Sequence, residues 1–433
     1  MDPVMPQPAL FDPDQLVTED KIHSAIYTSE DIFELEMERI FHSSWMYLGH
    51  HSEIPNSGDY QVRQIGRQSV IMVRGDDGKV RALMNHCSHR GMAICEAEGG
   101  NEKFFRCWYH GWVYGTDGTL KDVPKQNGYS ESFNKADFSL AEAPWSQDYR
   151  GFHFVSLADP GIDFDDYLGN AKAYIDPFLD ASPEGEIEAL AGVHRTKYYG
   201  NWKFVGMDGY HPHFTHKSVL DMWAKQKGNN LGATHRGDPF ADDSGNLTRD
   251  MGNGHVMLDF YPGREQHYEP YLEGLVSTPS GKEYVAAMED FHGKEKAREQ
   301  LIWAGDPHAG IYPNMQLINI QIRIIRPISV NETEVLMFPT LLKGAPEEIN
   351  ATRLRHHESF YGPAGTGAPD DAELLERNQI GLHSSVNPWL FLGRGLDRQY
   401  RDDNGDLVGL VSDEVTQRGQ LKAWATLMGR SQT

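Results

Sequence analysis

Hydrophobic and polar positions change their spacing along the chain, and the first change lies near residue 45. Before it, Ser/Thr and acidic residues precede Ile32, Leu35 and Ile40 at helical spacing, which predicts a helix. After it, short alternating runs are separated by turn residues. The segments "SVIMVRGDDGKVRALMN" and "WVYGTDGTLKDV" each place two such runs around an Asp-Gly step, a pattern typical of antiparallel hairpins. Residues 45–160 are therefore predicted to form a small all-β domain.

Beyond residue 160 helical and strand patterns are mixed. The run "NMQLINIQIRIIRPI" alternates over its whole length and predicts one long strand. One face of that strand would carry Ile318, Ile320, Ile322 and Ile324, and the other Leu317, Asn319, Gln321 and Arg323. The run "NETEVLMFPTLL" should be its antiparallel neighbour. The tail "SDEVTQRGQLKAWATLM" predicts a helix that Ser412 caps and that buries Leu421, Trp424 and Met428. An α+β chain is expected, with a helical segment over 1–44, the β domain over 45–160 and a larger domain over 161–433.

The net charge of the chain limits the kinds of partner that it can bind. Forty Lys and Arg against 63 Asp and Glu give a formal net charge of −23, which disfavours nucleic acid and anionic membrane surfaces. No run approaches the ~20 apolar residues of a membrane span, and the first residues lack the basic start and apolar centre of a signal peptide. Three cysteines do not make a disulfide framework, so a cytoplasmic protein is expected.

Two short motifs combine cysteine with histidine. "NHCSHRG" supplies Cys87 and His89, and "RCWYHGW" supplies Cys107 and His110, 17 residues further on. Two thiolates and two imidazoles suit either zinc or an iron–sulfur cluster. A zinc finger would place both histidines on one helix, which this β-rich stretch does not offer. One Cys and one His in each loop favour a [2Fe–2S] cluster with both cysteines on one iron and both histidines on the other. Cys95 is expected to be a buried side chain and not a ligand.

These motifs resemble those of the Rieske non-haem iron oxygenases, the alpha subunits that hydroxylate aromatic rings. Residues 87–91 and 107–112 match the signature C-x-H-R-G and C-x-x-H-x-W at every fixed position. Respiratory-chain Rieske proteins carry two further cysteines in these loops, and this chain has neither. The resemblance implies that Cys87, His89, Cys107 and His110 hold a Rieske cluster.

A second candidate metal segment is "MDGYHPHFTH". Asp208 and His211 would share a helix face, whereas His211 and His216 would diverge unless Pro212 breaks the helix between them. Two imidazoles and one carboxylate form the facial triad of Fe(II) oxygenases. The segment resembles the family motif D-x-Y-H-x-x-x-x-H, which implies that His211 and His216 bind the iron. Asp208 would then link His211 to His110 of a neighbouring subunit, and His213 is expected to be a bystander.

The third iron ligand is expected from "YGPAGTGAPDDAELLERNQ", which resembles the family's F-G-P-A-G segment with a following Asp-Asp. The second aspartate, Asp371, aligns with the ligand. Its rivals are Asp370, a possible helix N-cap, and Glu373. The sequence departs from the family between Lys203 and Asp208, where about three residues, including a Glu-Asn pair, are absent.

The resemblance covers nearly the whole chain and implies its architecture and activity. The fold would be an all-β Rieske domain joined to a helix-grip, START-like catalytic domain with an antiparallel sheet. The protein would be a homotrimer (α3), or α3β3 with a small subunit. It would act as a terminal oxygenase in aromatic catabolism, using O2 and electrons from NADH to dihydroxylate or monohydroxylate a ring. N- or O-dealkylation, a Rieske electron carrier and a non-redox zinc protein are the alternatives.

NADH would act only through a reductase, often with a ferredoxin, because the chain has no nucleotide-binding G-x-G-x-x-G motif. Docking of an acidic partner on such an acidic chain requires a local basic patch. The candidates lie around the Cys–His motifs: Arg90, Lys103, Arg106, Lys121 and Lys125. The alternative is that these are ordinary solvated charges. The substrate-pocket candidates are Met207, His255, Met257, Leu317, Asn319 and Tyr361. Arg323 is a candidate for binding a substrate carboxylate or for a structural ion pair.

Overall fold

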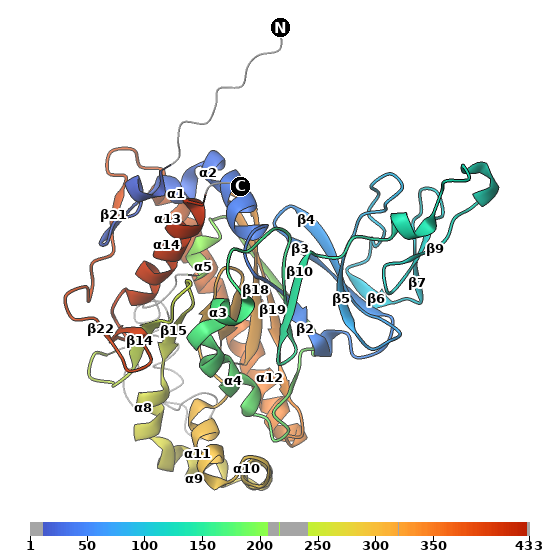
Figure 1. Cartoon of the computed structure of the whole chain (residues 1–433). Helices are drawn as coiled ribbons and strands as arrows, with labels where there is room; N and C mark the ends of the chain where they lie inside the picture. Colours follow the sequence, from blue (N-terminus) through green and yellow to red (C-terminus); the bar gives the residue numbers. More distant parts are fainter. Residues whose placement is uncertain (1–11, 207–215, 217–240, 319, 431–433) are drawn as a thin grey trace.

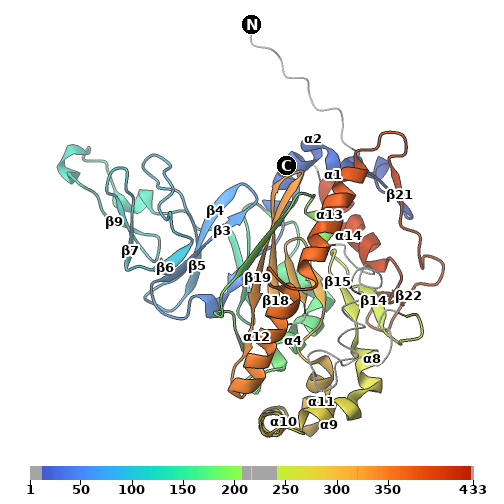
Figure 2. The same ribbon diagram turned by 180° about the vertical axis from the view of Figure 1, so that it is seen from behind.

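The computed structural model describes residues 12–206, 216, 241–318 and 320–430. Figure 1 shows a small β domain projecting from a larger body of helices and sheet, and Figure 2 shows the same arrangement from behind. The helical segment near the N-terminus lies on the larger body, next to the C-terminal helix. The chain thus contains a β domain and an α+β domain, as the predicted α+β fold class requires.

The β domain contains two small antiparallel sheets. One has the strand order β5 (Val80–Met84), β4 (Gln68–Arg74), β3 (Asp59–Ile65), β6 (Gly99–Asn101), and the other β7 (Phe104–Arg106), β8 (Val113–Gly115), β9 (Leu120–Asp122). The β4–β5 and β8–β9 pairs are the two hairpins predicted from their Asp-Gly turns. Their inward side chains form a separate hydrophobic core. A third sheet, β2 (Met46–His50) with β11 (Phe152–Ser156) and β10 (Trp145–Tyr149), lies where the two domains meet.

The larger domain is built on an antiparallel sheet of nine described strands. Their order is β13 (His194–Tyr198), β19 (Glu332–Pro339), β18 (Gln321–Ser329), β17 (Met315–Ile318), β16 (Ala309–Ile311), β15 (Val256–Asp259), β14 (Leu247–Asp250), β23 (Leu407–Leu410), β22 (Tyr400–Arg401). Two short pairs complete the strands: β1 (Lys21–His23) with β21 (Trp389–Phe391), and β12 (Ile187–Glu188) with β20 (Leu341–Leu342).

Helices cover both faces of this sheet and bury two large hydrophobic cores. The first core contains side chains of α3 (Phe164–Leu168), α4 (Lys172–Asp180), α9 (Tyr268–Leu275), α10 (Pro279–His292) and α11 (Lys294–Trp303), with α8 (Tyr261–Gln266) packed at its edge. The second core contains side chains of α1 (Ala25–Thr28), α2 (Glu30–Glu36), α5 (Lys203–Gly206), α12 (Glu347–Tyr361), α13 (Ala368–Leu382) and α14 (Val415–Met428). We call the sheet face that belongs to the second core the α12 face.

The prediction of one long strand over residues 314–328 is wrong in one respect. It is two strands, β17 and β18, which pair antiparallel with Ile318 opposite Gln321. The chain therefore reverses within the run, so Leu317 and Ile322 lie side by side in the first core, and Ile318 belongs to the second. Alternation alone cannot reveal such a reversal, because a tight turn continues the apolar pattern. The antiparallel neighbour β19 is confirmed.

The ends of three helices test the predicted caps. Ser29 caps α2 by accepting from the N–H of Ile32, and the helix continues as a π-helical turn over Met37–Phe41. Ser412 does not cap α14, which begins at Val415 after Glu414. Asp370 is not an N-cap either, because α13 begins at Ala368 after Gly367.

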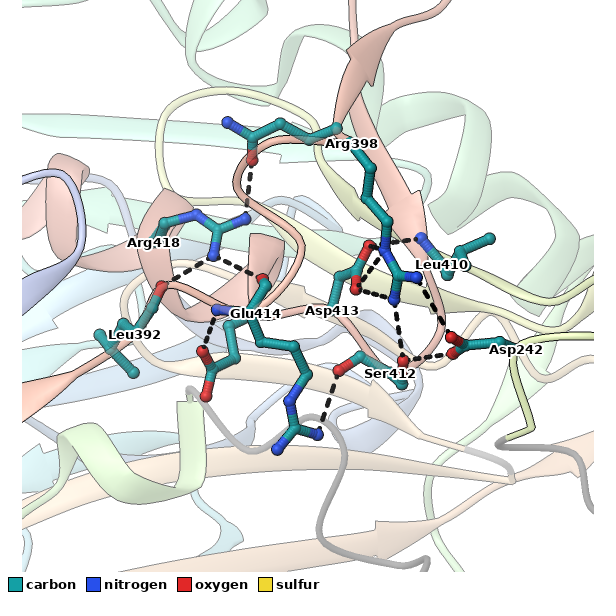
Figure 3. A network of polar contacts seen from close by, with 10 residues as sticks. Asp242, Leu392, Arg398, Leu410, Ser412, Asp413, Glu414 and Arg418 are labelled. Carbon is teal, nitrogen blue, oxygen red and sulfur yellow. Dashed lines mark hydrogen bonds and ion pairs between the residues drawn. The ribbon is translucent and has the colours of Figure 1, made fainter.

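Ser412 is instead part of a polar network that fixes the loop before α14 (Figure 3). Its hydroxyl donates to Asp242, which also pairs with Arg398 at 3.2 Å. Arg398 donates to the buried carboxylate of Asp413, with Nη2 at 2.5 Å, and the same carboxylate accepts from the N–H of Leu410 at 3.0 Å. The serine is therefore held by these side chains and not by the helix terminus.

No helix in the described part of the chain is both long and apolar enough to cross a membrane.

Candidate redox and metal sites

The two Cys–His loops of the β domain have the same backbone geometry. In the first, the N–H of Cys87 donates to the carbonyl of Met92 at 2.9 Å and the N–H of Gly91 donates back to the carbonyl of Cys87 at 2.8 Å. In the second, Cys107 and Gly111 make the equivalent bonds, with Trp112 as the acceptor residue. Both glycines have positive φ, +77° and +76°, a conformation that disfavours any side chain. The Gly that closes each motif is therefore required by the turn.

The side chains of these loops converge at the tip of the domain. Cys87 and Cys107 are each 1% exposed and belong to the β-domain core. The imidazole rings of His89 and His110 lie 4.5 Å apart between centroids, and His89 stacks on Trp112 at 4.7 Å. The Nδ1 atoms of both histidines are buried and have no hydrogen-bond partner in the described structure. Two buried thiols and two orphaned ring nitrogens fit a [2Fe–2S] cluster, whose Cys2His2 set needs these donors.

The spacing of the donors argues against a single zinc ion. Tetrahedral zinc holds its ligands about 2.0–2.3 Å from one centre, so its donor atoms lie within about 4 Å of one another. Among the described residues only His194, His357 and Glu358 bring three donor atoms within 4.8 Å of one another. The Cys87, His89, Cys107 and His110 set is more widely spread, as a two-iron cluster requires.

One thiol of this set has a hydrogen bond of its own. The hydroxyl of Tyr114 lies 3.2 Å from Cys87 Sγ and accepts from the N–H of Ser88 at 3.2 Å. Desolvation raises the pKa of Tyr114, and the bond to Cys87 raises it further, so the hydroxyl is the donor when Cys87 binds iron as a thiolate. Hydrogen bonds to ligand sulfurs tune the reduction potential of such clusters. The sequence analysis did not single out Tyr114, although its place two residues after Trp112 was visible.

A second convergence of donors lies on the catalytic domain. His216 Nε2 is 2.9 Å from Asp371 Oδ1, in the first turn of α13. His216 is 3% exposed and packs edge-on against the ring of Phe360 at 5.2 Å. An imidazole and a carboxylate brought together in this way are two of the three donors of a facial triad, and they fit a mononuclear iron.

The two rivals of Asp371 lie elsewhere. Asp370 is exposed, and Glu373 is exposed and pairs with Arg377 at 2.6 Å one helical turn further along α13. Of the three carboxylates, Asp371 is the one whose contact with His216 the structure records. Asp208, His211 and His213 lie outside the described residues, as do Met207 and Asn319.

The remaining pocket candidates fall on different sides of the sheet. Met257 and Leu317 are fully buried in the first core, whereas Tyr361, at the end of α12, belongs to the second core with the His216 side of the domain. His255 is completely buried, with Nε2 2.7 Å from the carbonyl of Tyr167 and Nδ1 accepting from the N–H of Tyr312 at 3.1 Å. Both ring nitrogens of His255 are thus used by the backbone, so it has none to offer a substrate.

Sequence reasoning missed three polar side chains that lie near Arg323. They come from β17, β18 and α12: Gln316, Gln321 and His357. The cross-strand pairing of β17 with β18 places Gln316 directly opposite Arg323. The signal was hidden because the run was interpreted as a single strand, which cannot bring two of its own residues side by side.

The basic residues proposed for docking lie around the Cys–His loops. Arg90, Lys103 and Arg106 are exposed and make no ion pair within the described part of the chain, whereas Lys121 pairs with Asp117 at 2.9 Å. Trp108 is 80% exposed and Tyr109 is 59% exposed in the second loop. The tip of the β domain therefore combines positive charge with bare aromatic surface.

Comparison with known proteins agrees with this geometry. Residues 44–136 match the Rieske [2Fe-2S] domain family, and residues 187–411 match the catalytic domain of the ring hydroxylating alpha subunit family. The chain is 33% identical to the anthranilate 1,2-dioxygenase large subunit of Acinetobacter baylyi over 87% of its own length and 80% of that protein. It is also 33% identical to the benzene 1,2-dioxygenase alpha subunit of Pseudomonas putida, over 94% and 91%. A naphthalene 1,2-dioxygenase structure with bound indole superposes with a TM-score of 0.80 at 25% identity, covering 96% of this chain and 95% of that one.

Proposed function

The chain belongs to the family of Rieske-type ring-hydroxylating oxygenase alpha subunits, and we propose that it dihydroxylates neighbouring carbons of an aromatic ring. As a member it is a terminal oxygenase with a Rieske [2Fe–2S] cluster and a mononuclear iron. A pure electron carrier is excluded, because such a protein would not contain the catalytic domain matched over residues 187–411. The contact of His216 with Asp371 carries the proposal, since it supplies an iron site beside the α12 face.

We assign the cluster to Cys87, His89, Cys107 and His110, and the iron to His211, His216 and Asp371. When bound, the cluster supplies single electrons and the iron supplies the position at which O2 is activated. The net reaction consumes O2, two electrons and two protons and adds both oxygen atoms to the ring. Asp208 is assigned as the carboxylate that bridges His110 of one subunit and His211 of the next.

The chain's own residues have separate tasks in this scheme. Burial of the two cysteines keeps water away from their sulfurs, and Trp112 stacks on His89 and holds its ring. Phe360 packs on the His216 ring and fixes its orientation, so that the nitrogen facing Asp371 stays in place. Tyr361, next in sequence and 4.7 Å from Phe360 between ring centroids, offers an aromatic wall to a flat substrate.

Oxygenases of this family receive electrons from ferredoxin or reductase partners. We propose that Arg90, Lys103 and Arg106, with the exposed Trp108 beside them, form the docking surface on this chain. The bridging role of Asp208 requires a neighbouring subunit, and we propose a trimer, as α3 or as α3β3. None of the three cysteines forms a disulfide, which fits a reducing cytoplasm.

The substrate class is open between two kinds of ring. Relatives of similar identity act, by their names, on aromatic acids (anthranilate, 2-halobenzoate) and on hydrocarbons (benzene, biphenyl). The names of the anthranilate, 2-halobenzoate and benzene enzymes are those of 1,2-dioxygenases, which favours dihydroxylation over monohydroxylation or dealkylation for this chain.

Iron analysis and single turnover test the proposal. The purified protein should contain about three irons per chain with acid-labile sulfide, two in the cluster and one mononuclear. Reduced protein given O2 and a panel of aromatic acids and hydrocarbons should release a dihydrodiol that mass spectrometry identifies. Full iron loading with no oxygenated product from any ring would contradict the proposed function, and a dealkylated product would favour the alternative.

A further inference from the structure

A row of side chains crosses the α12 face of the large sheet. Arg323 on β18 lies opposite Met337 on β19 and opposite Gln316 on β17, and Gln316 lies opposite Gly310 on β16. Directly opposite residues of antiparallel strands share a face, with Cβ atoms about 5 Å apart. Arg323 and Gln316 are therefore immediate neighbours on one surface, and Gly310 beyond them adds no side chain.

Arg323 is held in place by neutral groups. Its guanidinium lies over the ring of Tyr361, 5.0 Å from the centroid. With the amide oxygen of Gln321 turned toward it, Arg323 donates to that oxygen from Nε at 3.0 Å and Nη2 at 3.1 Å, and the Gln321 amide nitrogen donates to His357 Nε2 at 2.9 Å. This orientation of the amide satisfies both neighbours, so Gln321 fixes the guanidinium and leaves its other N–H groups available.

No carboxylate balances this charge within the described residues. Arg323 is half-buried and forms no ion pair there, whereas Arg326 on the other face of the same strand pairs with Glu334 at 2.9 Å. Glu358, which follows His357 on α12, lies 2.7 Å from His194 and is paired there. Burial and the neighbouring positive charges lower the pKa of His357 to about 3, so this ring is neutral and adds no charge. A half-buried guanidinium without a counter-ion is a ready site for an anion.

Gln316 contributes an acceptor that lacks a partner. The side chain is 6% exposed, and its Nε2 donates to the carbonyl of Val205 on α5 at 2.6 Å. Its Oε1 is buried and accepts no hydrogen bond in the described structure. A buried acceptor left unpaired costs about 1–3 kcal/mol, so such a group in a substrate-binding region is typically matched by a ligand donor.

This pair lies close to the iron site. Tyr361, which stacks on Arg323, contacts Phe360 at 4.7 Å, and Phe360 contacts His216 at 5.2 Å. The Val205 carbonyl that fixes Gln316 belongs to α5, and this helix begins five residues after the end of β13. Two aromatic side chains, Tyr361 and Phe360, thus separate the guanidinium from the proposed iron ligand His216.

We propose that Arg323 and Gln316 select the substrate, and that this substrate is an aromatic carboxylate with a hydrogen-bond donor at the adjacent ring position. The proposal rests on the proposed function, because it names the ring that the oxygenase accepts. The carboxylate pairs with the free edge of the Arg323 guanidinium. The neighbouring N–H or O–H donates to Gln316 Oε1, and Tyr361 contacts the face of the ring.

Binding and turnover of matched ligands test the role of Arg323. In the iron-loaded protein, calorimetry should show benzoate binding about 10- to 100-fold more tightly than benzamide, its neutral isostere. Arg323→Gln should reduce binding and kcat/KM for benzoate by a similar factor, and the ratio of benzoate to toluene turnover should fall with them. The affinity and kcat/KM of Arg323→Lys for benzoate should lie between those of the wild type and of Arg323→Gln. The control Arg377→Gln, which removes one exposed charge from α13, should change kcat/KM for neither substrate.

The ortho donor tests Gln316 separately. Wild type should prefer 2-aminobenzoate over benzoate by about 2- to 10-fold, the value of one neutral hydrogen bond. Gln316→Met preserves the length of the side chain and should abolish this preference. It should change kcat/KM for benzoate no more than it changes kcat/KM for toluene. Because the readout is a ratio of two ligands, any general loss of stability cancels. Equal values for the two acids in wild type would overturn the role of Gln316.

The outcomes separate this proposal from the function on which it rests. Dihydrodiol from toluene but not from benzoate, or equal losses for both rings in Arg323→Gln, would overturn the carboxylate assignment and leave the oxygenase intact. The absence of product from every ring would contradict the oxygenase, while calorimetry would still report whether the carboxylate binds. If Arg323→Gln does not fold, the comparison of benzoate with benzamide in wild type decides the question.

Discussion

Glu36→Gln should destabilise the protein strongly, because Glu36 joins three separate parts of the chain inside the second core. The carboxylate is completely buried and accepts from Lys203 Nζ at 2.6 Å, Trp202 Nε1 at 2.7 Å and Trp424 Nε1 at 2.6 Å. These partners come from the start of α5 and from α14, so one side chain of α2 holds the N-terminal helix, the C-terminal helix and the segment that leads to His211.

The cost follows from the charge that the substitution leaves behind. Lys203 is 3% exposed, with its ammonium over the rings of Trp202 at 5.1 Å and Tyr27 at 5.5 Å. Removing one partner of a buried ion pair costs about 3–5 kcal/mol, since the other charge stays without compensation. Burial lowers the pKa of Lys203 and Glu36 raises it. Without Glu36 the lysine gives up its proton more readily, so the free energy lost should decrease as pH rises.

Urea unfolding followed by tryptophan fluorescence measures this loss. The control is Glu34→Gln on the same helix, where the exposed carboxylate pairs with Arg67 and is worth less than about 1 kcal/mol. The double variant Glu36→Gln/Lys203→Met should recover part of the stability, because it removes the stranded charge. Equal effects of Glu36→Gln and Glu34→Gln would refute the reasoning, as would a double variant less stable than Glu36→Gln alone.

Three further predictions concern acid stability, iron loading and the loop before α14. Desolvation lowers the pKa of His255 to about 4, so between pH 6.5 and pH 4 the unfolded chain binds a proton at this residue and the folded chain does not. About 3 kcal/mol of stability is therefore lost as the pH falls through that range, and His255→Gln should remove this part of the pH dependence measured by urea unfolding. Asp371→Asn should lower iron from about three to about two per chain at unchanged sulfide, whereas Asp370→Asn keeps all three; equal loss in both would remove Asp371 from the ligand set. Arg398→Gln should cost about 2–3 kcal/mol by stranding the buried Asp413, and an unchanged urea midpoint would contradict this.

Local chemistry explains which parts of the structure the sequence could predict. The β4–β5 and β8–β9 hairpins follow from Asp-Gly turns, and the loops around Cys87 and Cys107 follow from glycines whose positive φ the turn requires. These features are settled within about ten residues, so no knowledge of the tertiary fold is needed.

The features that the sequence did not predict depend on distant partners. The reversal between β17 and β18 continues the apolar alternation, and only pairing in the sheet exposes it. Ser412 had the residue type of a cap, but Asp242, 170 positions away, uses its hydroxyl. The same holds for Arg323, because its proposed role depends on its contact with Tyr361 from α12 and on its neighbour Gln316 from the adjacent strand.

Both faces of the large sheet bury polar groups, among them Arg264 and Gln300 beside the first core and Glu36, Gln316 and Gln321 on the α12 face. Burying a polar group costs free energy unless the group finds a partner. Glu36 and Gln321 have such partners within the chain, whereas Oε1 of Gln316 and the free edge of the Arg323 guanidinium do not. Two of the groups left without a partner, Gln316 Oε1 and the free edge of the Arg323 guanidinium, therefore lie near His216, and a substrate would complete them.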